Sequence, residues 1–280
     1  MAVENPGAMD SRPPLLQVSG LNKTYASSSG DYEAIRDLSF ELRAGELVCL
    51  VGPSGSGKTT LLKCISGLMA PTRGEVRLSG TVISGAPRKM AVVFQEYGRS
   101  LFPWMRVEGN VGLPLKVAGV RTAERNKAVS EALHAVGLEH AGRKYPWQLS
   151  GGMQQRVAIA RALAYKPEIL LMDEPFAAVD AQTRAELEDL IRRIWKDLGV
   201  TVLFVTHDID ESVYLGERVL VLSGAPTVLA DDVVVDLPED RNQLETRALP
   251  RFAELRTRVY ALIQEAKHYQ QSASAASKQS

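Results

Sequence analysis

The feature that most constrains the fold is a glycine-rich segment with the spacing GxxxxGK[ST]. Its eight residues are Gly52, Pro53, Ser54, Gly55, Ser56, Gly57, Lys58 and Thr59. An apolar run with strand character, residues 47–51, precedes it, and a helical pattern follows from Thr60. In that context, glycines let successive backbone N–H groups turn toward one anionic centre. The sequence therefore predicts an α/β fold that binds a nucleotide, and not a glycine-serine turn that binds nothing.

The same segment predicts how the phosphates are held. The helix that starts near Thr60 directs its partly positive N-terminus at the loop. Lys58 supplies a full positive charge to the β- and γ-phosphates, and the Thr59 hydroxyl is a ligand for Mg²⁺. ATP and Mg²⁺ are the expected cofactors.

Strand-like and helical patterns alternate along most of the chain, which indicates an α/β protein with a largely parallel sheet. The strand candidates are residues 15–21, 34–42, 46–52, 74–80, 90–95, 168–174, 201–207 and 218–224.

Composition excludes few classes but narrows the partners. Lys plus Arg equals Asp plus Glu, at 33 each, which argues against a nucleic-acid binder with a broad basic surface. No apolar run reaches the roughly 18 residues needed to span a bilayer, so a membrane role is expected to come through a partner. Cys49 and Cys64 have no metal-ligand spacing and are expected to be small buried apolar side chains.

Two acids end an apolar strand candidate in the sequence ILLMDEP, residues 169–175. Consecutive strand residues alternate faces, so Asp173 and Glu174 can serve two roles. We expect Asp173 to face Mg²⁺ and Glu174 to act as general base on the attacking water. A solvated turn after the strand is the alternative.

A second anion-binding helix start lies in LSGGMQQR, residues 149–156, where Ser150 caps a helix and Gly151 and Gly152 leave the backbone bare. The chain already has a complete phosphate loop, so this second helix start requires a second nucleotide or the nucleotide of another subunit. The octapeptide resembles the signature of ATP-binding cassette (ABC) ATPases. That resemblance implies two copies packed head to tail, each ATP lying between the phosphate loop of one copy and the signature of the other.

The resemblance covers residues 15–237 and assigns further residues in the family's order. It implies that Gln95 and His207 contact the γ-phosphate, with Gln95 also near Mg²⁺, and that Asp180 communicates across the dimer. Tyr25 matches the aromatic residue that stacks on adenine, and Tyr32 is its competitor. The family more often has Ser-Ala-Leu-Asp where this chain has Ala177 to Asp180. The implied fold is an α/β P-loop NTPase (RecA-like) core with an antiparallel β edge and an inserted helical subdomain, of the ABC ATPase type.

The expected organisation has four parts: a flexible N-terminus at 1–14, the ABC ATPase domain at 15–240, an amphipathic helix region at 241–267, and a disordered tail at 268–280. Within the ATPase domain, residues 96–166 form the helical subdomain. One of its helices carries Val129, Leu133 and Val136 on one face and stops at Gly137. A second runs from Ser150 to Pro167. The C-terminal helix carries apolar residues at helical spacing, namely Phe252, Leu255, Val259, Leu262 and Ile263.

The segment LFPWMRVEGNV, residues 101–111, and the C-terminal helix resemble the nitrate/sulfonate/taurine branch of ABC importers. That branch implies ATP hydrolysis at the cytoplasmic face of the inner membrane, coupled to two permease subunits and indirectly to a solute-binding protein. Phe102, Pro103 and Trp104 are expected to dock the permease, with internal packing of Trp104 as the alternative. Other open alternatives are a vitamin-precursor importer, a lipid or lipoprotein exporter, a soluble ABC ATPase acting on DNA or the ribosome, and a P-loop kinase.

Overall fold

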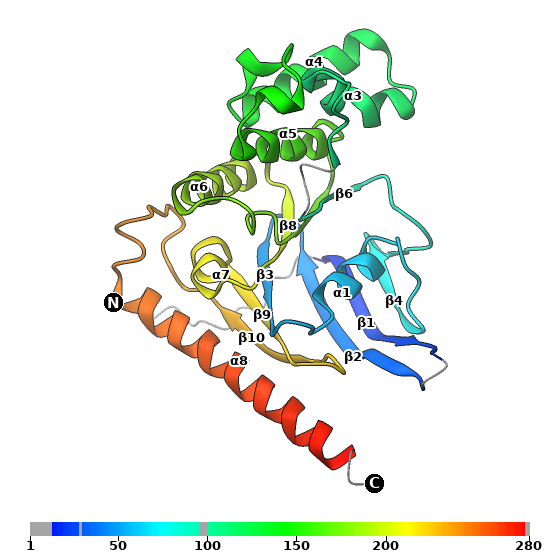
Figure 1. The fold of residues 1–280 in the computed structure, drawn as a ribbon, viewed down its shortest axis with the longest axis vertical. Helices are drawn as coiled ribbons and strands as arrows, with labels where there is room; N and C mark the ends of the chain where they lie inside the picture. The colour runs from blue at the N-terminus through cyan, green and yellow to red at the C-terminus, as the bar shows by residue number, and fades with distance from the viewer. Residues whose placement is uncertain (1–12, 28–29, 96–99, 278–280) are drawn as a thin grey trace.

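The computed structural model describes residues 13–27, 30–95 and 100–277. A six-stranded sheet forms its centre, and a four-stranded antiparallel sheet packs beside it (Figure 1). The six-stranded sheet has the order β10 (Leu229–Val234), β9 (Arg218–Leu222), β3 (Leu47–Val51), β8 (Thr201–Val205), β7 (Ile169–Asp173), β6 (Met90–Val93). All its neighbouring strands are parallel except β10, which runs antiparallel to β9.

The smaller sheet is the antiparallel edge expected from the sequence. Its order is β2 (Tyr32–Arg43), β1 (Pro14–Tyr25), β4 (Arg73–Leu78), β5 (Thr81–Val82). The eight strand candidates correspond to strands, whereas β5 and β10 were not among them. β5 has only two residues, both exposed, and the two acids Asp231 and Asp232 interrupt the apolar pattern of β10.

Strands β3, β7 and β8 are buried at every residue, because both faces of the sheet are covered. Because successive side chains of a strand point to opposite faces of the sheet, these strands contribute to two hydrophobic cores. Val48 and Leu50 of β3 join the core shared with the antiparallel sheet and α1 (Lys58–Ile65). Cys49 and Val51 join the opposite core, against helices α5 to α8. Cys49 and Cys64 are buried free thiols, as expected.

Three helices lie together at one end of the molecule, above the sheet in Figure 1: α3 (Val107–Val117), α4 (Thr122–Ala135) and α5 (Gly151–Ala164). Each contacts the other two, and α5 also contacts β6. Val129, Leu133 and Val136 are buried on one face, and Gly137 has a φ of +70° just after α4 ends. Two 3₁₀ turns, Glu139–Ala141 and Pro146–Gln148, lead to α5.

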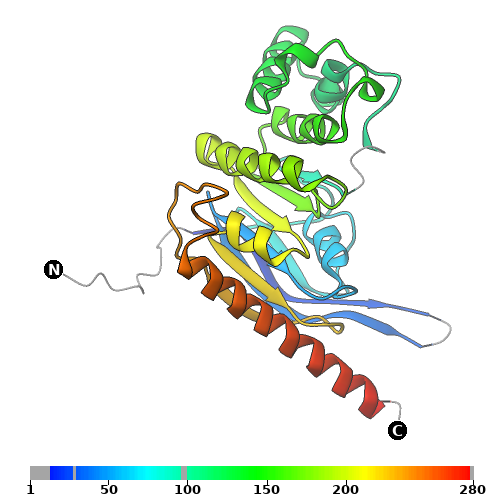
Figure 2. The same cartoon turned by 60° about the vertical axis from the view of Figure 1, so that its left-hand side comes forward.

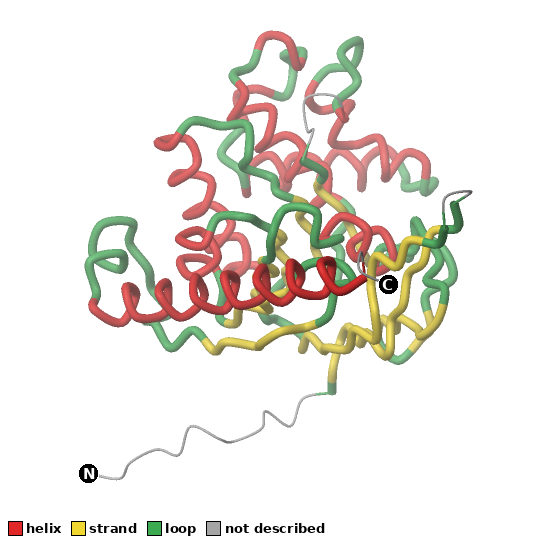
Figure 3. Tube along the Cα trace, turned by 60° about the horizontal axis from the view of Figure 1, so that its bottom comes forward, coloured by secondary structure: helices red, strands yellow, loops and turns green. Residues whose placement is uncertain are grey.

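The remaining helices cover the sheet: α6 (Ala181–Leu198), α7 (Ile209–Leu215) and the long α8 (Pro250–Ser277). Figures 2 and 3 show α8 running along the β9–β10 side of the molecule. Phe252, Leu255, Val259 and Ile263 are buried on that side, and Leu262 is partly buried. Within the described residues, no helix has both the length and the apolar content that crossing a membrane requires.

The C-terminus differs from the sequence expectation. Disorder was expected for 268–280, but α8 continues to Ser277. The segment is rich in Ala, a strong helix former, and extending a docked helix avoids the cost of nucleation. Residues 278–280 lie outside the described residues, as do residues 1–12 of the N-terminus expected to be flexible.

Candidate nucleotide site

The phosphate loop joins buried strand β3 to α1. Gly55 and Gly57 both have a φ of +76°, a conformation that suits glycine, and Gly57 is the N-cap of α1. Gly52 allows close packing, because a Cβ there would lie 2.9 Å from Ser56 Oγ and 3.0 Å from Leu222 Cβ. Glycine is therefore required by the positive φ at residues 55 and 57, and by close packing at residue 52.

Lys58 is folded back across this loop. Its Nζ donates to the carbonyl oxygens of Gly52, at 3.0 Å, and Pro53, at 3.1 Å. Glu174 Oε1 lies 3.9 Å from the same nitrogen. Burial lowers the pKa of Lys58, and the charges of Glu174 and Asp173 oppose that effect. The loop thus holds a buried cation whose partners are replaceable by phosphate oxygens.

Asp173 and Thr59 form the candidate magnesium site. Asp173 ends β7, is 5% exposed and is hydrogen-bonded to the side chain of Thr59. Burial raises the pKa of Asp173, and the bond from Thr59 lowers it. Among the described residues, no group of three His, Cys, Asp or Glu side chains forms a metal site of its own. One hydroxyl and one carboxylate suit Mg²⁺, which commonly takes its remaining ligands from phosphates and water.

Glu174 lies at the centre of the candidate catalytic residues. Its Oε2 is 3.1 Å from His207 Nδ1 and accepts a hydrogen bond from Gln95 Nε2 at 3.4 Å. Its backbone has a φ of +43°, which is strained for a non-glycine residue, and its N–H donates to Val205 O at 2.8 Å. The structure therefore brings together Lys58, Gln95, Glu174 and His207, which the sequence placed in four separate segments.

Tyr25 lies beside the start of α1. Its hydroxyl is 3.2 Å from Thr60 Oγ1 and donates to Met69 Sδ at 3.4 Å. Tyr32 faces Tyr25 across the β1–β2 pair and is more exposed, at 53% against 36%. As directly paired residues, Tyr25 and Tyr32 point to the same face of the antiparallel sheet, and Tyr25 is the one bonded to α1.

The signature stands apart from the phosphate loop. Ser150 caps α5, its Oγ accepting from Met153 N at 3.3 Å, and Gly151 begins the helix. Figure 1 shows α5 in the helical group and α1 beside the sheet, with a clear separation between them. One copy of the chain does not bring its own signature onto its own loop.

The signature instead touches the segment of Asp180. A Cβ on Gly152 would lie 2.5 Å from Thr183 Cγ2, so the backbone of Gly152 packs closely against the Thr183 side chain. Asp180 is the N-cap of α6 and accepts from Thr183 N at 2.9 Å and Thr183 Oγ1 at 2.7 Å. These bonds lower the pKa of Asp180. The signature therefore contacts the segment of Asp180 through Thr183.

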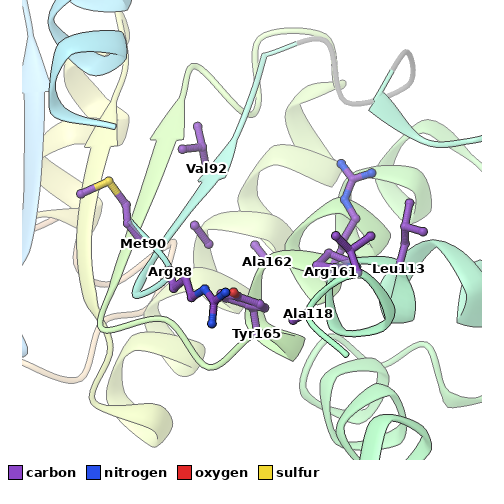
Figure 4. A pocket seen from close by; sticks show the side chains of 11 residues that line it. Arg88, Met90, Val92, Leu113, Ala118, Arg161, Ala162 and Tyr165 are labelled. Atoms are coloured by element: carbon purple, nitrogen blue, oxygen red, sulfur yellow. The ribbon is translucent and has the colours of Figure 1, made fainter. Parts of the chain in front are cut away.

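A groove lies between β6, α3 and α5 (Figure 4). Its volume is about 580 Å³. Apolar surface lines it from Val92 of β6, Leu113 of α3, Ala162 of α5 and Tyr165, which follows α5. Arg161 adds a half-buried guanidinium, and desolvation lowers its pKa.

The segment expected to dock a partner lies near the start of α3. Trp104 is 72% exposed, so its internal packing is ruled out, and its ring contacts Phe102 with centroids 5.4 Å apart. The fully buried Asn110 bonds to Phe102 N and O and to the carbonyl oxygens of Met105 and Arg106. Asn110 thus fixes the loop that presents Trp104. Residues 96–99, included in the expected subdomain, lie outside the described residues.

The phosphate loop, the two acids Asp173 and Glu174 at the end of β7, and the parallel sheet define the class of P-loop nucleoside triphosphatases. The chain belongs to the ABC transporter family, which it matches over residues 35–177. It is accordingly an ATP-binding and ATP-hydrolysing cassette of that family.

Curated relatives extend the match over most of the chain. The nitrate import ATP-binding protein NrtD of Synechocystis sp. is 42% identical over 232 residues, 83% of this chain and 86% of the relative. The taurine import ATP-binding protein TauB of Roseobacter denitrificans is 38% identical over 252 residues, 89% and 93% of the two chains.

Solved structures agree in fold. The ATP-binding cassette MJ0796, a dimer in a post-hydrolysis state bound to ADP and Pi, matches with a TM-score of 0.69 and 34% identity. That match covers 79% of this chain and 98% of the other. CbiO1 of Clostridium perfringens, part of the ABC transporter complex cbiONQ, has a TM-score of 0.72 and 28% identity, covering 79% and 89%.

Proposed function

We propose that this chain is the ATPase subunit of an importer for solutes of the nitrate, sulfonate or taurine type. The similarity to nitrate and taurine import ATP-binding proteins supports the cargo class. In this proposal the chain lies peripherally on the cytoplasmic face of the cell membrane. It acts with two permease subunits and, through them, a solute-binding protein, and it uses no nucleic acid.

ATP binds on the surface formed by Tyr25 and residues 52–60. The adenine stacks on Tyr25, whose hydroxyl is already fixed on Thr60. The phosphates receive the backbone N–H groups of the loop and the start of α1. Lys58 exchanges the carbonyl oxygens of Gly52 and Pro53 for β- and γ-phosphate oxygens.

Thr59, Asp173 and Gln95 hold Mg²⁺ in this proposal. The pair formed by the Thr59 hydroxyl and the Asp173 carboxylate supports this assignment. Gln95 is included because it bonds to Glu174, the residue next to Asp173. When bound, the ion neutralises negative charge on the phosphate oxygens.

Glu174 accepts a proton from the attacking water as general base. Such assistance accelerates a reaction by roughly 10²–10⁴-fold. Lys58 offsets charge on the γ-phosphate, and His207 and Gln95 hold both the phosphate and the carboxylate of Glu174. The strained backbone of Glu174 fixes the direction of its side chain.

A second copy completes each site. Its Ser150, Gly151 and Gly152 meet the γ-phosphate, with its Asp180 alongside. The separation of α5 from α1 within one copy supports this arrangement, and the dimeric MJ0796 cassette offers a precedent for the assembly. Binding of ATP closes the dimer, and hydrolysis reopens it.

Closure moves the helical group, and the permease follows through a contact at Phe102–Val107 and the adjacent groove. The exposed Trp104 and the apolar lining of the groove suit a short amphipathic helix.

The observation that carries the proposal is the convergence of Lys58, Gln95 and His207 on Glu174. The test is uptake into liposomes that contain the permease, with ATP on the side of this chain and nitrate or taurine with its solute-binding protein on the other. We expect ATP-dependent uptake that Glu174→Gln abolishes. Hydrolysis that never responds to the permease or the solute-binding protein would refute the transport role.

A further inference from the structure

One ion pair joins the two halves of the site within a single chain. Arg184, one turn into α6, places its Nη1 3.1 Å from Oδ2 of Asp208. Asp208 follows His207 directly and caps α7, its Oδ1 accepting from Glu211 N at 3.1 Å. The pair is about one-third exposed on both sides.

Each end of this pair is fixed to a different half of the site. On one side, the backbone N–H of Arg184 donates to Asp180 O, and the neighbouring Thr183 packs on Gly152. On the other side, Asp208 N donates to Thr206 Oγ1, and His207 Nδ1 faces Glu174. In the proposed dimer these halves serve different ATP molecules.

Arg184 and Glu211 each have a buried polar atom without a hydrogen-bond partner among the described residues. These atoms are Nε of Arg184 and Oε1 of Glu211. Both side chains line one small cavity, together with Glu174, Thr206 and His207. A guanidinium has five donors in a planar fork. Within the part of the chain that the structure describes, Arg184 therefore keeps a free donor on the side of the cavity that Glu211 lines, while its Nη1 holds Asp208.

We propose that Arg184 is a positioning residue that transmits the state of one ATP site to the other. A nucleotide held by the signature and Asp180 fixes the start of α6, and Arg184 then holds Asp208 so that His207 faces Glu174 and the chain's own ATP. The inference rests on the proposed function, because it requires the shared sites. It adds a route by which the two sites affect each other.

The first test is a double-mutant cycle on ATP hydrolysis by the full-length chain. We expect Arg184→Gln to lower kcat about tenfold while KM for ATP changes less than about twofold. In a His207→Ala background the same change should cost less than about twofold, since Arg184 acts through His207. Arg184→Lys should restore part of the rate, and Arg193→Gln, an exposed site on the same helix, is the matched control.

An equal loss in both backgrounds, or no loss in either, would overturn the coupling. A second measurement covers the case in which His207→Ala leaves no measurable rate. The chain has four histidines, and His207→Ala assigns the His207 ring signals in an NMR spectrum. We expect Arg184→Gln, but not Arg193→Gln, to shift those signals. An unmoved His207 spectrum contradicts the coupling alone, whereas normal turnover in His207→Ala contradicts the proposed site.

Discussion

Glu174 Oε2 and His207 Nδ1 lie 3.1 Å apart, at the ends of two adjacent parallel strands. In the register of β7 and β8, Asp173 is opposite Val205, so the residues that follow both strands emerge at one edge of the sheet. Parallel sheets bind ligands at that edge. The contact gives Glu174 a fixed neighbour before any substrate arrives.

Glu174→Gln removes the carboxylate that we propose accepts the proton and keeps the shape of the side chain. We expect ATP hydrolysis to fall by about 10²–10⁴-fold, with ATP affinity retained. The variant should form a dimer that persists in ATP, measured by size-exclusion chromatography. Near-normal turnover would eliminate Glu174 as the general base.

Lys58→Ala removes the buried cation that the loop holds on the carbonyl oxygens of Gly52 and Pro53. We expect loss of ATP binding, by about 100-fold or more in Kd, because a charged hydrogen bond to phosphate is lost. Calorimetry or a fluorescent ATP analogue measures it. Lys63→Ala, an exposed site on the same helix, should bind ATP normally, and an equal effect at both positions would refute the assignment.

Tyr25 and Tyr32 provide a matched pair, since they face each other across two strands. Stacking on a base contributes about 1–3 kcal/mol. We expect Tyr25→Ala to weaken ATP binding by about 5- to 100-fold, and Tyr25→Phe and Tyr32→Ala to change it little. A larger loss in Tyr32→Ala would move the adenine contact to Tyr32.

Glu211 predicts a pH dependence of stability. Burial raises the pKa of Glu211 to about 8 from an ordinary 4.5. Between these two values the unfolded chain is ionised at this residue while the folded chain keeps the proton. Glu211 therefore destabilises the fold increasingly as pH rises from 4.5 to 8, and by a constant amount above that.

Glu211→Gln removes the titration and keeps a neutral side chain of the same shape. In urea unfolding, we expect it to match the wild type near pH 5 and to be more stable at pH 8, on the order of a few kcal/mol. The exposed Glu245→Gln is the control. A stability gap that does not grow with pH would contradict the shifted pKa.

The sequence predicted most of the fold because the local signals agree with the packing. The apolar runs of β3, β7 and β8 are buried on both faces, and Ser150 and Asp180 each cap a helix where the sequence changes to helical spacing. The C-terminal segment was misjudged, because Ala and Ser content alone does not distinguish a disordered tail from the extension of a docked helix.

The site was predicted only as separate motifs. The contact of Glu174 with Gln95, and the packing of Gly152 on Thr183, depend on strand register and helix placement that one sequence does not encode locally. Arg184 and Asp208 were missed for the same reason. Their partial signals were the helix cap in Asp208-x-x-Glu211 and the placement of Arg184 one turn after Asp180.

The most direct test of the shared site is complementation between two inactive variants. Lys58→Ala is expected to disable the phosphate loop. Ser150→Glu places a negative charge where we propose that the partner's phosphate binds, at a helix start that tolerates it. A mixed dimer keeps one intact site, with the loop from one copy and the signature from the other. A 1:1 mixture should hydrolyse ATP well above the sum of the two variants, up to about one quarter of the wild-type rate for random pairing. A mixture no more active than that sum would contradict the shared site.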